Sequence, residues 1–422
     1  MQDQFPDTSS VQGELGRVQL AWLAAAVLVV STGYGALMPL LPTWLVLARP
    51  DAAASEVADH VGFITGVYAL GVLLGAPLWG LLSDRVGRTP ILIMGLIGYV
   101  ASLLLLLAPS LTGLPGLYAL RGASGFFVAA VIPVVSALIA ERTRPWQRAR
   151  RFAWLGAVSL IGFLFGPWLN AAADWISQGA LREMSAPQVV VGLSALLGAV
   201  TIAGQIWTLP RSLPSPSSPR PDRGGHQDEG FAALCGLDTM VMFALSGFEV
   251  GIMLQGQQHP DLSSRQVSMM FAECSLVMLG VNAVLFFSEL LERTAPRKLI
   301  CTGLLLAITG LALLAWHRAE AWMYLGVSLT SAGTGLVLPV IAYVAAGAER
   351  ARLGVTMGGL AAASSVGQIL GSAVGGWLFG VAAQHSYGWL TAPLVAILAL
   401  VLLRPTWWAS QPSPQPQHQP PA

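Results

Sequence analysis

Four ionisable residues lie inside long apolar stretches of this sequence: Arg121, Asp238, Glu249 and Glu273. A charge at the centre of a bilayer costs at least about 2.5–3.5 kcal/mol, so such residues persist mostly where they bind a proton, an ion or a substrate. The pattern therefore predicts proton or substrate coupling at these four positions. Asp238 lies near one end of its apolar stretch, and for it we keep the alternative of an interfacial residue in contact with water.

The remaining reactive side chains predict no enzyme. The histidines are expected in loops, span ends or tails, so we expect no histidine proton relay through the membrane. They are His60, His226, His259, His317, His385 and His418. No nucleophile–base pairing, metal-ligand spacing or phosphate loop is present, so we expect no cofactor and no metal. The net charge of +1, without a basic patch, also argues against nucleic acid as a partner.

Composition indicates what must position these residues. The chain is 55% hydrophobic and 10% charged, with a mean hydropathy of +0.65, which is typical of an integral membrane protein. Only helices or closed barrels satisfy the backbone in lipid, and apolar runs of this length predict an all-α membrane protein with twelve transmembrane helices. The expected spans are 18–47, 61–82, 90–108, 114–140, 152–172, 188–209, 231–254, 265–288, 297–316, 321–347, 353–380 and 388–403.

A segment rich in Pro, Ser and charge, residues 210–230, divides the spans into six and six and is expected to be a cytoplasmic linker. This gives an N-terminal cytoplasmic tail, a six-helix bundle, the linker, a second six-helix bundle and a disordered C-terminal tail. Their expected limits are 1–17, 18–209, 210–230, 231–403 and 404–422.

The distribution of basic residues predicts the orientation in the membrane. Of the 22 Lys and Arg residues, Arg121 lies within a span, and with both termini inside only Arg49, Arg182, Arg265 and Arg318 fall outside. Cytoplasmic loops carry the excess of Lys and Arg, so both termini are expected in the cytoplasm.

The stretch GLLSDRVGRTP, residues 80–90, places an acid and two arginines in the loop between the second and third spans. Its residues Gly80, Leu82, Asp84, Arg85, Gly87 and Arg88, followed by Leu92, resemble the loop signature of the major facilitator superfamily. Three further motifs resemble those of its twelve-helix drug:proton antiporters: GYGALMPLLP with Gly33, Pro39 and Pro42, LYALRGASG with Arg121 and Gly125, and GFLFGPWLN with Gly162, Gly166 and Pro167. The last departs from the family pattern, because Asn170 and Ala171 replace two glycines.

The second half repeats the plan in weaker form, with GQILGSAVGG in the eleventh span where GFLFGPWLNA stands in the fifth. The resemblance implies two pseudo-symmetric six-helix bundles that rock around a substrate site between them. In this fold Asp84 would meet the positive N-terminus of the helix that begins near Leu353 and bias the outward-open state. The glycines of the two motifs are expected to pack helices closely and to let the halves touch and slide; they are Gly162, Gly166, Gly367, Gly371 and Gly375.

Spacing places Glu249 and Glu273 at one depth, about 8–12 Å below the outer surface at 1.5 Å per residue, on adjacent antiparallel helices. Arg121 lies at a similar level in the other half, so all three can face one cavity. Two carboxylates this close disfavour double ionisation. Three interpretations stay open: a proton carrier at Glu249 or Glu273 modulated by Arg121, a fixed ion pair, or an anchor for a cationic substrate.

These observations and the resemblance predict a proton-coupled exporter of a small organic molecule. A dedicated exporter of a secreted metabolite such as a siderophore, and a proton-independent facilitator or importer of sugars or organic acids, are the alternatives. The expected partners are a small-molecule substrate, protons and the lipid bilayer. We expect a monomer in a bacterial inner membrane.

Overall fold

The computed structural model describes residues 15–108, 113–143, 145–178, 184–209, 229–258, 262, 264–288, 290–317, 319–348 and 353–403. These residues form α-helices and short 3₁₀ turns, with no β-strand among them. The helices are α1 (Arg17–Leu37), α2 (Leu41–Ala48), α3 (Ala54–Val86), α4 (Arg88–Leu105), α5 (Leu114–Val128), α6 (Ile132–Glu141), α7 (Pro145–Gln178), α8 (Ala186–Thr208), α9 (Glu229–Gln258), α10 (Ser264–Phe287), α11 (Leu290–Arg293), α12 (Pro296–Trp316), α13 (Glu320–Ala348), α14 (Leu353–Ala382) and α15 (Ser386–Leu403). The predicted linker and tails lie almost entirely outside the described residues.

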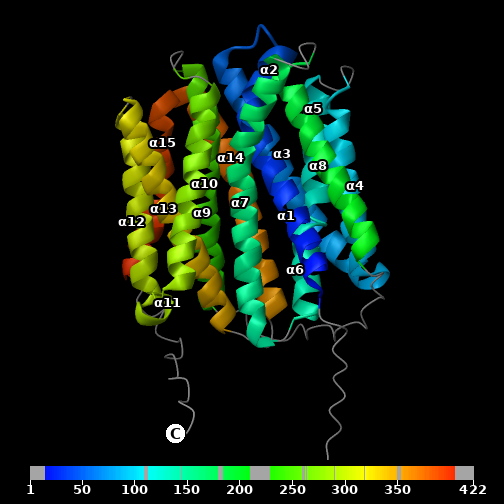
Figure 1. The fold of residues 1–422 in the computed structure, drawn as a ribbon. Coiled ribbons are helices and arrows are strands. Elements are labelled where there is room, and N and C mark those ends of the chain that lie inside the picture. The colour runs from blue at the N-terminus through cyan, green and yellow to red at the C-terminus, as the bar shows by residue number, and fades with distance from the viewer. Residues whose placement is uncertain are drawn as a thin grey trace, which may run out of the picture.

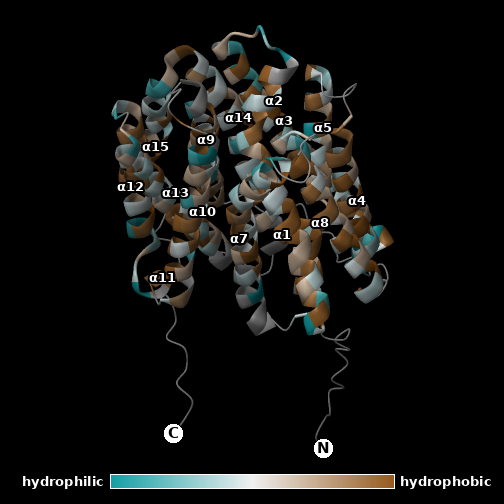
Figure 2. Cartoon of the chain, turned by 45° about the horizontal axis from the view of Figure 1, so that its top comes forward, coloured by the Kyte–Doolittle hydropathy of each residue, from teal (hydrophilic) through white to brown (hydrophobic). Residues whose placement is uncertain are grey.

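Eleven helical segments of the described chain are long and apolar enough to cross a membrane. The last of them, Thr356–Leu403, has 48 residues and contains both α14 and α15, which a 3₁₀ turn at Ala383–His385 separates. Hydrophobic colouring covers the middle of the helices, and hydrophilic colouring gathers toward their ends (Figure 2). The protein is therefore an integral membrane protein.

Two of the predicted spans are not single helices. The first breaks at a 3₁₀ turn, Met38–Leu40, and the fourth breaks between Val128 and Ile132. Both breaks stand next to prolines, Pro39 and Pro133, whose missing N–H removes one hydrogen bond of the helix ladder. The sequence-based boundaries overlooked these breaks because hydropathy continues through them.

The start of α3 also corrects an expectation. The helix begins at Ala54, before the apolar window, so His60 lies inside it and not in a loop. Its Nδ1 lies 2.9 Å from the hydroxyl oxygen of Tyr118, and nearby Glu56 pairs with Arg49 at 2.8 Å. The helix extends beyond the apolar window because these polar side chains satisfy one another at its end.

The helices form two groups side by side, α1–α8 and α9–α15 (Figure 1). Within the first group α1 packs on α7, and within the second α9 packs on α14. Between the groups α3 packs on α14, and α10 packs on α7. The four pairings follow the internal repeat, because α9, α10 and α14 occupy in the second half the places that α1, α3 and α7 occupy in the first.

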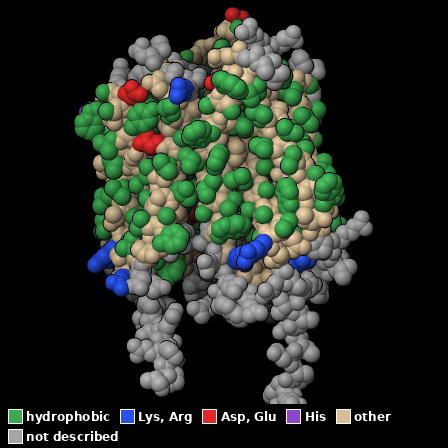
Figure 3. Space-filling view, viewed as in Figure 1, with side chains coloured by type: hydrophobic (Ala, Val, Ile, Leu, Met, Phe, Trp, Pro, Cys, Tyr) green, Lys and Arg blue, Asp and Glu red, His purple; other side chains and the backbone are tan. Residues whose placement is uncertain are grey.

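The two ends of the bundle differ in charge. We call the end where α1 begins and α15 finishes the lower end, as in Figure 1, and the opposite end the upper end. On the face shown in Figure 3, most Lys and Arg side chains line the lower edge, whereas Asp and Glu lie toward the upper edge. An apolar band separates the two edges.

Candidate functional site

Arg121 lies on α5 in the interior of the first half, with 4% of its surface exposed. Its guanidinium carbon lies 4.5 Å from the ring centre of Tyr68 and 5.6 Å from that of Tyr34, and Nη2 lies 3.7 Å from the sulfur of Met38. Among the described residues no carboxylate forms an ion pair with it. Contact of a cation with aromatic faces is worth about 0.5–2 kcal/mol and here takes the place of a counter-ion.

Close packing of α5 on α3 produces this arrangement. Gly125 lies directly against the backbone of Tyr68, and Gly122 lies against the side chain of Val67. A Cβ at Gly125 would overlap the Tyr68 carbonyl, so only glycine lets the two helices come this close. The contact brings Arg121, one turn before Gly125, over the Tyr68 ring.

Tyr34 connects this cluster to the second half. Its hydroxyl accepts a hydrogen bond of 3.2 Å from Nε2 of Gln368 on α14. Its ring lies 5.7 Å from that of Phe163 on α7, and Phe163 lies 6.2 Å from Phe271 on α10. An aromatic junction that we call the aromatic cluster, made of Tyr34, Tyr68, Phe163 and Phe271, therefore spans the contact between the halves.

Glu249 faces this junction from α9. Protein atoms surround its carboxyl group, which acts electrostatically on both Tyr34 and Cys274, yet part of the residue remains accessible. Among the described side chains no cation pairs with it, and Arg121 interacts with Tyr34 instead. Tyr34 thus lies within electrostatic range of both Arg121 and Glu249, and the described residues contain no ion pair between these two, the fixed pair that the sequence left open.

Glu273 is oriented differently. One of its oxygens accepts a hydrogen bond from the hydroxyl of Ser328 on α13, and the other has no partner among the described residues. Cys274, next in the chain, is within electrostatic range of both Glu249 and Glu273. Both carboxylates thus act on Cys274, and Glu273 bonds to α13 where that helix packs on α10.

Asp238 lies lower on α9 and is buried, with 3% of its surface exposed. Its carboxylate accepts a hydrogen bond from the hydroxyl of Ser364 on α14. At the same level the Thr239 hydroxyl donates to the carbonyl of Ala363 at 3.2 Å. Asp238 is thus buried within the protein, and its depth in the membrane, on which the interfacial alternative depends, stays a prediction.

Comparison with known proteins identifies the fold that holds these residues. Two stretches of the chain, residues 23–252 and 230–422, match the model of the Major Facilitator Superfamily. The chain belongs to the Major Facilitator Superfamily. Its membership makes it a membrane transporter and not an enzyme, as the motifs had indicated.

Relatives of the chain include resistance proteins of bacteria. It is 27% identical to "Tetracycline resistance protein, class B" of Escherichia coli, over 89% of this chain and 92% of the relative. It is 24% identical to "Multidrug resistance protein 2" of Bacillus subtilis (strain 168), over 90% and 93%. These are the drug-efflux relatives that the resemblance predicted.

Solved structures of other superfamily members share the fold. The human organic anion transporter MFSD10 (TETRAN) superposes with a TM-score of 0.70 at 19% identity, covering 91% of this chain and 99% of that one. The POT family transporter PepTSo gives a TM-score of 0.77 at 12% identity, covering 94% and 99%. Identities this low show the fold alone.

The superfamily signature, residues 80–90, was expected to be a loop but lies at the end of α3 and the start of α4, with only Gly87 between the two helices. Asp84 pairs with Arg88 at 2.7 Å, and its side chain is 52% exposed. Arg88 also donates to the hydroxyl of Ser83, and Gly87 adopts φ = 106°, a conformation that favours glycine. The side chains of residues 353–355, where α14 begins, lie outside the described residues, so the expected contact of Asp84 with the start of α14, near Leu353, stays a prediction.

The glycine motifs pack helices within each half. Gly162 and Gly166 of α7 lie against the α1 backbone, where added Cβ atoms would come within 2.7 Å of the Leu28 oxygen and 2.5 Å of the Ala36 nitrogen. Gly367, Gly371 and Gly375 of α14 lie in the same way against α9. The prediction that these glycines let the two halves touch was therefore wrong about the partner, because α1 and α9 are the neighbours within each half.

Asn170 accounts for one departure from the family motif. Its Nδ2 donates a hydrogen bond of 3.1 Å to the carbonyl oxygen of Ala36 on α1. The amide thus contacts the helix backbone that the adjacent Gly166 approaches by close packing. The motif keeps its α1–α7 contact with a polar side chain in place of a glycine.

Contact between the halves depends instead on Gly62 of α3 and Gly376 of α14, near the upper end. A Cβ on Gly376 would lie 2.6 Å from the Ala58 oxygen and 2.8 Å from the Gly62 Cα. At the lower end Gly80 of α3 and Gly358 of α14 have no atom within 4 Å of such a Cβ. The halves touch at the upper end and are apart at these two lower positions.

Sequence reasoning missed Tyr34, Tyr68, Gln368 and the Gly62–Gly376 contact. Tyr34 stands between the two glycines of the first motif, and that position could have identified it. Gln368 could have been found from the polar residues spaced by four along α14, Ser364, Gln368 and Ser372. The contact between α3 and α14 involves ordinary apolar helix faces, and nothing in its local sequence indicates its partner.

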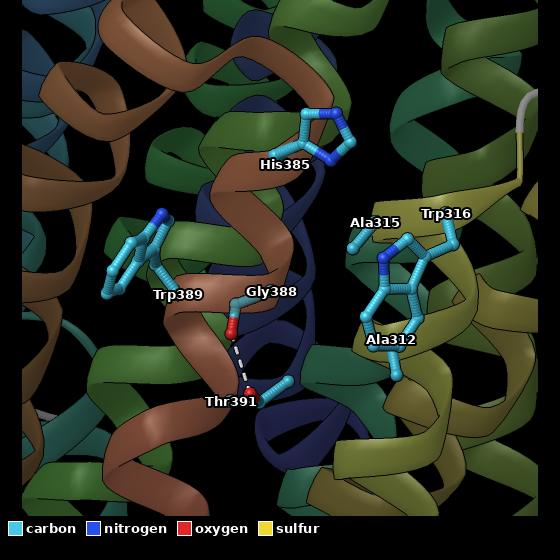
Figure 4. Close-up of a pocket in the computed structure, with 7 residues that line it drawn as sticks. All are labelled: Ala312, Ala315, Trp316, His385, Gly388, Trp389 and Thr391. Carbon is cyan, nitrogen blue, oxygen red and sulfur yellow. Dashed lines mark hydrogen bonds between the residues drawn. The ribbon is translucent and has the colours of Figure 1, made fainter.

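A separate hollow of about 340 Å³ lies between α12 and α15 at their upper ends (Figure 4). It is lined by Ala312, Ala315, Trp316, His385, Gly388, Trp389 and Thr391. Trp316 and Trp389 are 73% and 65% exposed, as expected for tryptophans at a membrane–water interface. None of the residues around Arg121 and Glu249 lines this hollow.

Proposed function

We propose that the protein is a secondary active transporter that exports a small organic molecule by proton antiport with alternating access. Its bacterial relatives include tetracycline and multidrug resistance proteins, which supports a drug-like compound or secreted metabolite as the substrate. The single observation that carries the proposal is Glu249, a carboxylate without a described counter-charge where the two halves meet. A proton supplies the counter-charge that the structure lacks.

In this proposal the chain crosses the membrane twelve times, because α14 and α15 each cross once within the segment Thr356–Leu403. Residues 18–209 and 231–403 then form the two bundles, 210–230 links them on the cytoplasmic side, and 1–17 and 404–422 are cytoplasmic tails. The lower end is cytoplasmic, in agreement with its Lys and Arg side chains. The transporter acts as a monomer in the bacterial inner membrane.

The contacts of α3 with α14 support an inward-facing state for this structure. The halves meet at Gly62 and Gly376 near the upper end, whereas Gly80 and Gly358 at the lower end make no such close contact with the described residues. In the outward-facing state the lower ends close, and Asp84 then meets the positive N-terminus of α14. Arg85 and the ion pair of Arg88 hold the loop in position for that contact.

Within the site we assign the proton to Glu249, with Glu273 as the second candidate carboxylate. Arg121 modulates the carrier through Tyr34, which it contacts on one face while Glu249 acts on it from the second half. A substrate that enters the aromatic cluster would disturb this contact and change the environment of Glu249. Substrate and proton then compete for one site, which is what antiport requires.

Proton flux in proteoliposomes tests the proposal. An imposed substrate gradient, with tetracycline, ethidium, siderophores and sugars as separate probes, should drive proton movement in the opposite direction for at least one organic probe. The pH change inside the vesicles reports it. Counterflow of sugars or organic acids that is insensitive to pH would overturn the proposal in favour of a facilitator.

A further inference from the structure

We propose that Asp238 is a second proton-carrying carboxylate, which receives the proton below Glu249 on α9, and that Ser364 is the residue that positions it. The inference rests on the proposed proton antiport and adds the route by which the proton leaves. In the transfer, the carboxylic acid of Glu249 gives up its proton and the carboxylate of Asp238 gains it. Asp238 then releases the proton to water at the lower end and is again a carboxylate, while Glu249 stays ionised until it takes up the next proton.

The helix register places the two carboxylates on one face. Eleven residues separate Asp238 from Glu249, which is close to three turns of 3.6 residues, so the two side chains leave α9 within about 20° of each other. The rise of 1.5 Å per residue puts Asp238 about 16 Å nearer the lower end. A proton that moves down this face of α9 passes both.

The described residues around Asp238 supply a hydrogen bond but no counter-charge. Its carboxylate is buried and accepts the Ser364 hydroxyl. The described ionisable neighbour is the Cys235 thiol, one turn lower on α9. The sequence of α14 contains no ionisable residue, and the ionisable residues of α10 and α15 lie toward the upper end.

A carboxylate buried without a cation is costly when ionised, because its desolvation is not repaid by an opposite charge. One hydrogen bond from a neutral hydroxyl contributes about 0.5–1.5 kcal/mol and does not offset that cost. Binding a proton removes the charge. Burial therefore makes it costly in free energy to keep Asp238 ionised, which disfavours a purely structural role and suits a proton carrier.

Polar groups on α14 connect the two levels. The helix runs parallel to α9, with Gly367, Gly371 and Gly375 in contact with α9 from Thr239 to Gly247. Gln368 lies one turn above Ser364, and its amide donates to Tyr34, on which Glu249 acts. Ser364 at the level of Asp238 and Gln368 one turn above it thus offer hydrogen-bonding groups over the first ~6 Å of this path.

Ser364 is held where it must act. Thr239 and Ala363 fix α9 against α14 beside it, so the hydroxyl reaches Asp238 without freedom to turn away. Because the hydroxyl favours the ionised carboxylate, its loss should change when Asp238 binds a proton and leave Glu249 unaffected. A change at Asp238 alone would distinguish a positioning role of Ser364 from a general effect on protein stability.

Infrared difference spectroscopy of the full-length protein in lipid nanodiscs tests the inference without a known substrate. The carboxylic acid C=O stretch is followed as pH is stepped between about 4 and 9, a range that covers shifted carboxyl groups. We expect D238N and E249Q each to remove a different titrating band, and the double variant to remove both. S364A should displace the midpoint of the Asp238 band alone, S364T should restore it, and the neighbouring variant S365A is the matched control.

The outcomes separate the inference from the proposed function. If D238N removes no titrating band while E249Q does, the second carrier is wrong and the proposed function stands. If E249Q removes no band, the proposed proton carrier itself is wrong. A fall in thermal stability of S364A with an unchanged Asp238 midpoint would reduce Ser364 to a structural contact and overturn its positioning role.

Discussion

At the scale of the residue, the site is built from charges that lack ordinary partners. Arg121 is buried against aromatic faces, and Glu249 and Asp238 have no cation among the described side chains. Fixed ion pairs would neutralise these groups and hold them in one state. Their separation leaves each free to exchange a proton or a contact during transport.

Replacement of Arg121 by lysine should reduce transport about tenfold, because an ammonium group lacks the planar guanidinium that lies over Tyr68 and Tyr34. Initial rates of proton-coupled efflux in proteoliposomes measure the effect, at matched protein incorporation. The control is R265K, which changes an exposed arginine at the start of α10. Equal rates for R121K and R265K would show that the aromatic contact of Arg121 has no part in transport.

Removal of the Tyr34 hydroxyl should weaken the link between the halves. Y34F keeps the ring under Arg121 but loses the hydrogen bond to Gln368, at a cost of about 0.5–1.5 kcal/mol. We expect slower transport with little loss of thermal stability. Y118F, which loses the contact with His60 near the upper end, is the control; if both variants transport alike, the Tyr34–Gln368 bond does not contribute.

At the scale of the element, helix packing decides which surfaces move. Glycines in α7 and α14 join each helix to α1 and α9 within its own half, so these pairs move as units. Gly62 and Gly376 form a contact between the halves, and the proposed alternating access requires it to open in each cycle. Local sequence predicted the helices and the small residues, because both follow from apolar length and residue size. It could not predict which helix each glycine meets, since that depends on the arrangement of the whole bundle.

Addition of a methyl group at Gly376 should prevent closure of the upper end, because the new Cβ would overlap the backbone of Ala58 and Gly62. G376A is expected to lose most transport and to increase labelling of a cysteine placed near the upper end. G192A, at an open position on α8, is the matched control. Normal transport by G376A would show that the α3–α14 contact is not a moving seal.

The prediction for Asp84 also concerns a contact between helices. In this state Asp84, half-exposed on the last turn of α3, pairs with Arg88 at the start of α4, so D84N should leave expression and thermal stability nearly unchanged. Transport should fall, because the variant loses the charge that meets the N-terminus of α14 in the opposite state. Measurement of both expression and efflux is needed, and full efflux by D84N would contradict the gating role.

At the scale of the whole molecule, two repeated halves meet at the aromatic cluster, and both Arg121 and Glu249 act on its Tyr34. The twofold plan, the span positions and Arg121, Glu249 and Glu273 as interior charges followed from composition and spacing. The aromatic cluster did not, because Tyr34, Tyr68, Phe163 and Phe271 come from four helices whose neighbours only the tertiary structure defines. Sequence spacing likewise did not predict that Glu273 bonds to Ser328, because spacing fixes the depth of a residue along a helix more closely than the direction of its side chain.

The central claim is that a carboxylate at the junction of the halves carries the proton, and one paired assay tests it most directly. E249Q and E273Q are each reconstituted and assayed for uphill efflux driven by a pH gradient and for downhill substrate exchange. We predict that E249Q loses uphill efflux by about a hundredfold, about 2.7 kcal/mol, and retains exchange, since only the first needs the proton. Full pH-driven efflux in both variants would contradict the account.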